Sequence, residues 1–336
     1  MSISLVIPAK NEEESLRELY RQIVEVAGAQ GYEMEILFID DGSTDGTWRV
    51  IEAIAAADAR VRGLRFRRNF GKAAALHAGF ANVHGDFVVT LDADLQDDPH
   101  EIPHLLAKLD ETGSDGRTYD VVSGWKKIRN DPRFLKVIPS RIFNGMIGWL
   151  TGVKLHDHNC GMKAYRAEVV REIRMYGEMH RFIPVLAAAR GFRVTEIPVH
   201  HHARQHGVSK YGFTRFVKGF LDLLTTKFAT TWGTRPLHLL GTIGLVSGLM
   251  GLICLVCFVC FGVGQPPRWW NTLLLGVGIG ECLLATQCVL TGLTMELRIY
   301  HNAPTRPEYT ILATTERVEN GKRAESSQTG GDEQSK

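Results

Sequence analysis

The chain has 336 residues and a formal net charge of +2, and 44% of its residues are hydrophobic. This length suits one large core with appendages, and the near-neutral charge excludes a protein that binds nucleic acid through its overall charge. Residues 1–10 lack a basic flank followed by an apolar stretch and a cleavage site, so we expect no secretory signal.

The first part of the chain alternates between strand and helix patterns. Strands are predicted at residues 4–8, 35–39, 62–66 and 86–91. Helices are predicted between them, at residues 12–26, 48–57 and 72–83. Further on, strands are predicted at residues 121–124 and 194–199, and a helix at 138–150. The alternation predicts an α/β fold with a mostly parallel central sheet and helices on both faces.

Each of the first four predicted strands is followed by a polar segment. These segments are residues 8–12, 40–45, 66–72 and 92–99. Parallel α/β sheets bind their ligands beyond the carboxyl ends of the strands. We therefore expect the four segments to converge on one crevice.

The segment 92–99 reads Asp-Ala-Asp-Leu-Gln-Asp-Asp-Pro. Asp92 and Asp94 can reach one hard cation together, Mg²⁺ or Mn²⁺, whose shell is completed by phosphate oxygens and water. Such a metal neutralises a diphosphate leaving group, as sugar transfer from a nucleotide donor requires. Taken alone the pattern is weak, because Asp is common in turns.

Four segments together carry a resemblance to a known family. They are PAKNE at residues 8–12, DDGSTD at 40–45, NFGK at 69–72 and DADLQDDP at 92–99. This set resembles the signature of the inverting family-two glycosyltransferases with the GT-A fold. The resemblance covers residues 1–100 and implies a Rossmann-like domain that binds a nucleotide sugar.

The resemblance also implies roles for particular residues. The implied donor-binding residues are Pro8, Ala9, Asn11, Glu12, Asp40, Asp41, Lys72, Asp92, Gln96 and Arg204. The implied ligands of the Mg²⁺ or Mn²⁺ cofactor are Asp92, Asp94 and Gln96.

Residues 92–99 look like the polyprenyl-phosphate branch of the family, which includes dolichyl-phosphate mannose synthases and bacterial bactoprenyl glucosyltransferases. In that branch a basic-x-x-x-Ser element holds the acceptor phosphate. Lys136 and Ser140 match it, with Lys in place of the more usual Arg, and the adjacent Arg141 is expected to help. Residues 204–211 resemble a mobile loop over the diphosphate, with Arg204 and Lys210 as phosphate clamps. A basic loop that only attracts anionic lipid is the alternative.

These features predict an inverting transfer of a hexose-type sugar from a nucleotide-diphosphate sugar, UDP rather than GDP, to polyprenyl (undecaprenyl or dolichyl) phosphate. The product would serve cell-envelope or glycan assembly. The residues expected to carry catalysis are Asp92, Asp94, Lys136, Ser140, Arg141, Arg204 and Lys210. Two alternatives stay open: another lipid acceptor such as diacylglycerol, and a non-catalytic membrane scaffold or lipid-translocation subunit.

The last third of the chain carries two apolar runs. Residues 237–264 hold no ionisable side chain except His238, and residues 272–293 are apolar apart from Glu281. Each run is long enough to cross a bilayer, so we expect a transmembrane hairpin of two helices. Residues 211–232 alternate aromatic and basic side chains, which fits a helix in the membrane interface or an amphipathic core helix. Glycines in the spans also allow homo-oligomers.

Basic residues flank the two apolar runs, and only Arg268 lies between them. By the positive-inside rule, the catalytic domain and both termini are predicted to be cytoplasmic, in a bacterial inner membrane. The predicted organisation is a catalytic domain at residues 1–210, an amphipathic helix at 211–236, two transmembrane helices at 237–299 and a cytoplasmic tail at 300–336, disordered at its end.

Three features have no assigned role. Asp97 and Asp98 depart slightly from the usual run of the polyprenyl-phosphate branch. The histidines at residues 200–202 are better explained as structural or loop-lining than as metal ligands, because neighbours along a strand point to opposite faces. Glu281 is costly inside a span, so we expect it to mark a functional contact or to pair within the hairpin or an oligomer.

Overall fold

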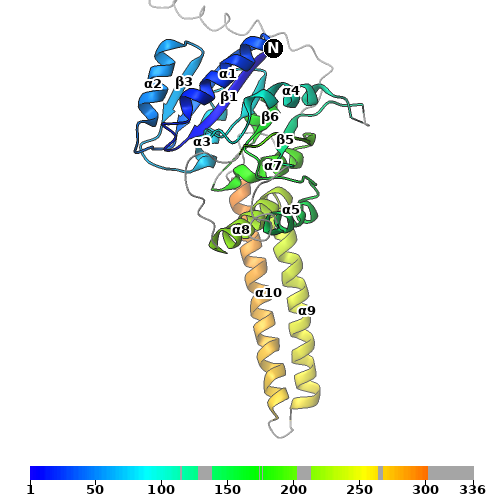
Figure 1. Cartoon of the computed structure of the whole chain (residues 1–336). Coiled ribbons are helices and arrows are strands. Elements are labelled where there is room, and N and C mark those ends of the chain that lie inside the picture. Colours follow the sequence, from blue (N-terminus) through cyan, green and yellow to red (C-terminus); the bar gives the residue numbers. More distant parts are fainter. Residues whose placement is uncertain are drawn as a thin grey trace, which may run out of the picture. The chain divides into compact units, whose positions relative to one another are not determined.

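The computed structural model describes residues 1–113, 116–127, 138–173, 175, 177–202, 213–263 and 268–301. Within these residues, the strands form one seven-stranded sheet in the order β3-β2-β1-β4-β6-β5-β7 (Figure 1). The strands are β1 (Ser2–Ala9), β2 (Glu33–Asp40), β3 (Val61–Arg65), β4 (Phe87–Thr90), β5 (Val121–Trp125), β6 (Lys163–Arg166) and β7 (Val194–Pro198). β6 runs antiparallel to β4 and β5, and the other pairs are parallel. The prediction of a mostly parallel sheet is confirmed.

Helices cover both faces of this sheet. They are α1 (Leu16–Gln30), α2 (Thr47–Ala57), α3 (Lys72–Phe80), α4 (Ile102–Asp110), α6 (Ala167–Glu172) and α7 (Ile183–Ala189), with 3₁₀ turns η1 (Pro99–Glu101) and η3 (Met179–Phe182). On one face, α1, α2 and α4 pack with Leu5 and Ile7 of β1. On the other face, α3, α6 and α7 pack with Val6. Successive side chains of β1 thus enter opposite cores, which explains the continuous apolar run of this strand.

The ends of the predicted strands lie within two residues of the observed ends, whereas the first helix is displaced. It was predicted from residue 12, but α1 begins at Leu16. The intervening residues bind the segment after β2 instead, since the Glu12 N–H donates to Thr47 Oγ1 (2.9 Å) and the Glu13 carboxylate accepts from the Gly46 N–H (2.8 Å). Contacts between the two segments therefore delay the helix.

Two further helices, α5 (Ile138–Thr151) and α8 (Phe213–Thr231), are amphipathic, with apolar and polar residues on different faces. Both contribute to a small core that contains Ile147, Phe182 and Leu223. Their other faces carry exposed apolar residues, namely Ile142 and Trp149 on α5 and Phe220, Leu221 and Leu224 on α8. Trp149 is 83% exposed.

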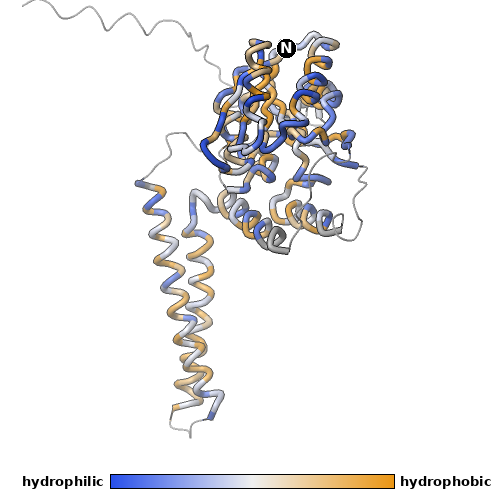
Figure 2. Tube along the Cα trace, turned by 60° about the vertical axis from the view of Figure 1, so that its left-hand side comes forward, coloured by the Kyte–Doolittle hydropathy of each residue, from blue (hydrophilic) through white to orange (hydrophobic). Residues whose placement is uncertain are grey.

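The C-terminal helices α9 (Pro236–Gly262) and α10 (Trp269–His301) form a hairpin. Both are long and apolar enough to cross a membrane, and apolar or weakly polar residues occupy most of their length (Figure 2). Their backbones approach closely, because a Cβ atom on Gly251 would lie 2.9 Å from the carbonyl oxygen of Gly278. The Ser247 hydroxyl donates to Glu281 Oε2 (2.7 Å). Glu281 therefore has a partner within the hairpin.

Candidate active site

The segment after β1 is joined to the segment after β2 by hydrogen bonds. The Asn11 N–H donates to Ser43 Oγ (3.0 Å), and Asn11 Oδ1 accepts from the Thr44 N–H (2.9 Å). Asn11 has φ 57°, a left-handed conformation that Asn tolerates better than most residues. The structure thus brings the predicted donor-binding residues Asn11 and Glu12 together with the loop that precedes α2.

Pro8 and Ala9 are the last residues of β1, and Ala9 pairs with Asp40 at the end of β2. The Asp40 side chain is fully buried. Its Oδ1 accepts from the Ser43 N–H (2.8 Å), and its Oδ2 lies 3.3 Å from Arg65 Nε. Asp40 therefore holds the turn after β2, and a contact between Asp40 and the nucleoside stays a prediction.

Asp41 connects the end of β2 to α3. Its carboxylate accepts the backbone N–H groups of Phe70 (2.7 Å) and Gly71 (3.0 Å), directly before α3 begins at Lys72. Gly71 has φ 93°, a conformation that favours glycine. Asp41 therefore satisfies N–H groups at the start of α3 and fixes the segment that contains the predicted donor-binding residue Lys72.

The paired acids lie directly beyond β4. Lys72 and Asp92 form an ion pair. The Gln96 N–H donates to Asp94 Oδ1 (3.3 Å). Leu95 between them has φ 57°, which is rare for a bulky residue and which proteins retain mainly where a functional geometry demands it. The structure therefore brings Lys72 to the predicted metal ligands.

The loop before β6 lies against the Asp92 carboxylate. A Cβ atom on Gly161 would be 2.5 Å from Asp92 Oδ2, so only glycine fits here without displacing the acid. The Thr90 hydroxyl donates to the Gly161 carbonyl (2.8 Å) and fixes the loop. Lys72, Gly161, Lys163 and Arg181 are among the residues that line a small cavity.

Three titratable residues of the cavity wall are deeply buried. Burial lowers the pKa of the Lys163 ammonium, which donates to the carbonyl oxygen of Cys160. Burial and the nearby Lys163 charge lower the pKa of His158 to about 4, so this imidazole is neutral at pH 7. Burial raises the pKa of the Cys160 thiol to about 12, which excludes it as a thiolate nucleophile. Among these three residues, Lys163 therefore places an amino group at the cavity wall.

The predicted acceptor-phosphate residues are described only in part. Ser140 is in the first turn of α5 and is half-buried, and the neighbouring Arg141 is exposed. Lys136, Arg204 and Lys210 lie outside the described residues, so their roles stay predictions.

Two residues that had no assigned role from the sequence lie at the same edge of the sheet. Asp97 is 1% exposed. Lys126 follows β5, and its Nζ lies 3.8 Å from Asp97 Oδ1. β6 runs antiparallel to both β4 and β5, so the carboxyl ends of β4 and β5 lie at the same edge of the sheet. Inspecting the residues that follow the fifth predicted strand, as was done for the first four, would therefore have found Lys126.

The residues present fit a hard divalent cation. Asp92 and Asp94 supply carboxylate oxygens and Gln96 an amide oxygen. The Asp92 carboxylate already binds one cationic group, the Lys72 ammonium. No group of three His, Cys, Asp or Glu side chains in the described part of the chain is arranged to hold a metal. A metal on this pair would therefore draw further oxygens from a diphosphate and water.

A mostly parallel sheet with this polar edge and these paired acids is the arrangement expected of a glycosyltransferase of the GT-A fold. Residues 4–174 match the model of glycosyl transferase family 2. The chain belongs to this family.

Relatives and solved structures agree with this assignment. The chain is 36% identical over 322 residues to the dodecaprenyl-phosphate galacturonate synthase of Rhizobium johnstonii, an alignment that covers 93% of this chain and 92% of the relative. It is 41% identical over 243 residues to an undecaprenyl-phosphate 4-deoxy-4-formamido-L-arabinose transferase of Shewanella sediminis, covering 72% and 70%. The fold resembles glucosyl-3-phosphoglycerate synthase from Mycobacterium tuberculosis in complex with Mn²⁺, UDP and phosphoglyceric acid, with a TM-score of 0.50 and 20% identity, covering 68% of this chain and 78% of that one.

Proposed function

We propose that this protein transfers a sugar from a nucleotide-diphosphate sugar to a polyprenyl phosphate, with inversion at the anomeric carbon. The observation that carries the proposal is that Lys72 pairs with Asp92, two residues before Asp94, and also lines the cavity that Lys163 and Arg181 line. Carboxylates that can bind a metal thus lie near basic side chains that can bind phosphate. A reaction between a diphosphate donor and a phosphate acceptor requires both. The names of the two relatives supply the acceptor class.

The donor would lie across the ends of β1, β2 and β4. Mg²⁺ or Mn²⁺ held by Asp92, Asp94 and Gln96 would neutralise the charge that develops on the leaving nucleoside diphosphate. Asn11 and Glu12 shape the nucleoside end, where the two joined segments form a rigid floor. UDP is the preferred nucleotide, because the mycobacterial synthase of the same fold was solved with UDP and Mn²⁺.

The acceptor would approach from the side of α5. Its phosphate is already an anion and needs no protein base, so Ser140, Arg141 and Lys136 would only have to hold it in line with the anomeric carbon. The exposed apolar residues of α5 and α8 suit contact with the membrane interface, where the phosphate of a polyprenol lies. The hairpin of α9 and α10 would anchor the chain in the bacterial inner membrane, with the catalytic domain and both termini in the cytoplasm.

The sugar is proposed from the relatives and from the cavity. The Rhizobium relative is named for galacturonate, whose carboxylate would suit the positive charge of Lys163 and Arg181. The Shewanella relative is named for a formamido-arabinose, which has no carboxylate. UDP-galacturonate is therefore the first donor to test, with neutral UDP-sugars and a GDP-sugar as comparisons.

The test is transfer of radiolabel from these donors into undecaprenyl phosphate by the purified full-length protein with Mn²⁺. We expect label in the lipid fraction for the wild type and a loss on the order of 10²- to 10³-fold for Asp94→Ala. Asp110→Ala is the matched control, because Asp110 is an exposed acid at the end of α4 that pairs with Arg166. No transfer from any donor, with equal UDP binding by wild type and Asp94→Ala, would contradict the proposal and favour a membrane scaffold.

A further inference from the structure

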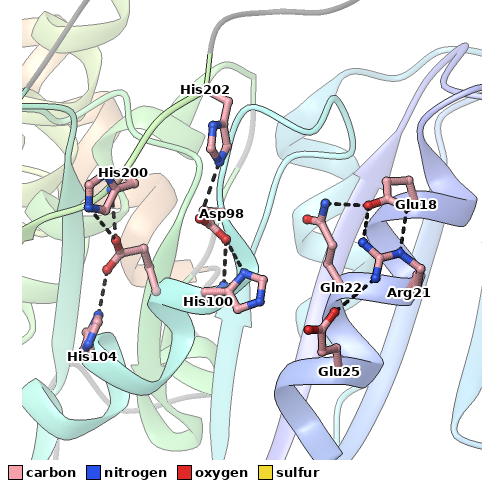
Figure 3. A network of polar contacts seen from close by, with 10 residues as sticks. Glu18, Arg21, Gln22, Glu25, Asp98, His100, His104, His200 and His202 are labelled. Carbon is pink, nitrogen blue, oxygen red and sulfur yellow. Dashed lines mark hydrogen bonds and ion pairs between the residues drawn. The ribbon is translucent and has the colours of Figure 1, made fainter. Parts of the chain in front are cut away.

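The three histidines that follow β7 each contact an acid of the segment that follows the metal ligands. His201 Nδ1 lies 3.5 Å from Asp97 Oδ1, and His202 Nε2 lies 3.4 Å from Asp98 Oδ2. His200 contributes through its backbone N–H, which donates to Glu101 Oε1 (3.2 Å). We name this set of His200, His201, His202, Asp97, Asp98 and Glu101 the histidine–acid cluster. In Figure 3, His202 and His100 reach the Asp98 carboxylate from two sides.

The backbones of the two segments are joined as well. Asp97 and His201 form an antiparallel β-bridge, and the His202 N–H donates to the Gln96 carbonyl (2.9 Å). Gln96 is a predicted metal ligand, so the chain that leaves β7 is attached directly to the metal-binding loop. The contacts within the histidine–acid cluster therefore fix this loop against the end of β7.

Asp97 is the buried centre of the cluster, at 1% exposed. Its Oδ2 accepts from the Asp92 N–H at 3.4 Å, and its Oδ1 lies 3.8 Å from Lys126 Nζ. Lys126 Nζ in turn lies 3.3 Å from His201 Nε2. One carboxylate thus contacts the ends of β4, β5 and β7.

We propose that Asp97 is a positioning residue for metal binding: through Lys126 and His201 it holds Asp92 and Gln96 in place. This inference rests on the proposed function, because it assumes that Asp92, Asp94 and Gln96 bind the metal. Asp97 itself is buried and is not among the residues that line the cavity. Its effect must therefore pass through the geometry of the loop.

A merely structural role would have a different signature. Removing a buried charge that pairs with Lys126 destabilises a protein wherever the pair lies. Only a positioning role also predicts weaker metal binding in the folded state, because residues that orient metal ligands typically contribute 10- to 100-fold in metal affinity or activity. The decisive measurement is therefore Mn²⁺ affinity, which does not depend on turnover.

The experiment titrates Mn²⁺ into full-length protein with UDP and follows the six-line electron paramagnetic resonance signal of free Mn²⁺. For Asp97→Asn we expect Mn²⁺ affinity to fall about 10- to 100-fold. His201→Gln should weaken Mn²⁺ binding by itself but add little in the Asp97→Asn background, because both act through one contact. Asp110→Asn is the matched control and should bind Mn²⁺ as the wild type does, because Asp110 pairs with Arg166, which lies beside the first residue of β4, at the opposite end of this strand from Asp92.

Mn²⁺ affinity within threefold of the wild type for a folded Asp97→Asn would overturn the inference, as would additive effects of the two substitutions. If Asp97→Asn does not fold, His201→Gln decides, because its imidazole is partly accessible and its loss leaves the Asp97–Lys126 pair in place. Wild-type protein that binds no Mn²⁺ with UDP and transfers no sugar would contradict the proposed function instead.

Discussion

Replacing Gly161 by alanine is expected to impair sugar transfer while leaving the fold intact. The added methyl carbon would lie 2.5 Å from Asp92 Oδ2, whereas ordinary contacts begin near 3.4 Å. Gly161 is buried and its carbonyl accepts from Thr90, so the backbone is fixed and the carboxylate has to move. The displacement needed is about 0.9 Å.

The magnitude follows from this displacement. Misplacing a reacting group by about 1 Å costs on the order of 10²-fold in rate, so we expect kcat to fall by about that factor. Overpacking a closed core costs about 1–3 kcal/mol, but the Asp92 side chain is 31% exposed and can move toward solvent. The free energy of unfolding should therefore fall by less than about 1 kcal/mol.

The assay is sugar transfer to undecaprenyl phosphate over a series of Mn²⁺ concentrations, with thermal unfolding measured on the same preparations. Gly28→Ala on α1 is the matched control, because its new Cβ atom meets nothing within 4 Å. A helix-interior alanine at that position should raise stability by about 0.5–1 kcal/mol and leave transfer unchanged. Unaltered kcat and Mn²⁺ dependence in Gly161→Ala would refute the assignment of Asp92 to the reaction, and a large loss of stability would point to packing instead.

Three further predictions concern buried groups. Because burial raises the pKa of the Cys160 thiol to about 12, Cys160 should resist alkylation at pH 8 in the folded protein and react after denaturation, which mass spectrometry of its peptide would reveal. The pKa of His158 is lowered from 6.5 to about 4, so the unfolded chain binds a proton that the folded chain does not, and stability should fall as the pH drops from 6.5 toward 4. Thermal unfolding across this range should show a flatter profile for His158→Asn, and an unchanged slope would contradict the cause. Ser247→Ala should lower hairpin stability by about 0.6 kcal/mol in a detergent unfolding titration, and no change would mean that Glu281 has another partner.

The central strands β1 and β2 were predictable because they contain apolar runs buried on both faces. Ile36 to Ile39 are almost fully buried, so this run carries the same signal as the strand it forms. β6 was not predicted, because its four residues read Lys-Ala-Tyr-Arg and place charges at both ends. Lys163 is nevertheless buried at 3% exposed, because it lines the cavity rather than the surface. A buried basic residue at the cavity wall thus stands where the apolar pattern that predicts strands would be expected.

The α4 helix was missed although its pattern is regular. Ile102, Leu105, Leu106 and Leu109 recur at helical spacing and are all buried. Asp98 caps the 3₁₀ turn η1 that leads into this helix, because its carboxylate accepts from the His100 N–H (2.9 Å). The signal was therefore present in the sequence.

Within the site, the sequence located the segments, whereas the hydrogen bonds of each side chain are known only from the structure. Asp40 and Asp41 were assigned to the donor, yet both carboxylates accept backbone N–H groups of the protein. The sequence alone does not distinguish an Asp at a strand end that contacts a ligand from one that closes a turn, because Asp is common in both positions. Asp97 shows the converse, because only the contacts with Lys126 and His201 reveal its place.

The cap that Asp41 provides has a consequence for how this fold handles phosphate. Many nucleotide-binding α/β proteins receive phosphate on the free N–H groups at the start of a helix, where the helix dipole favours negative charge. Here Asp41 supplies that negative charge from within the chain and bonds the N–H groups of Phe70 and Gly71. A carboxylate of the chain therefore already occupies part of the start of α3, and we expect a diphosphate to draw its positive charge mainly from a cation and from lysine side chains.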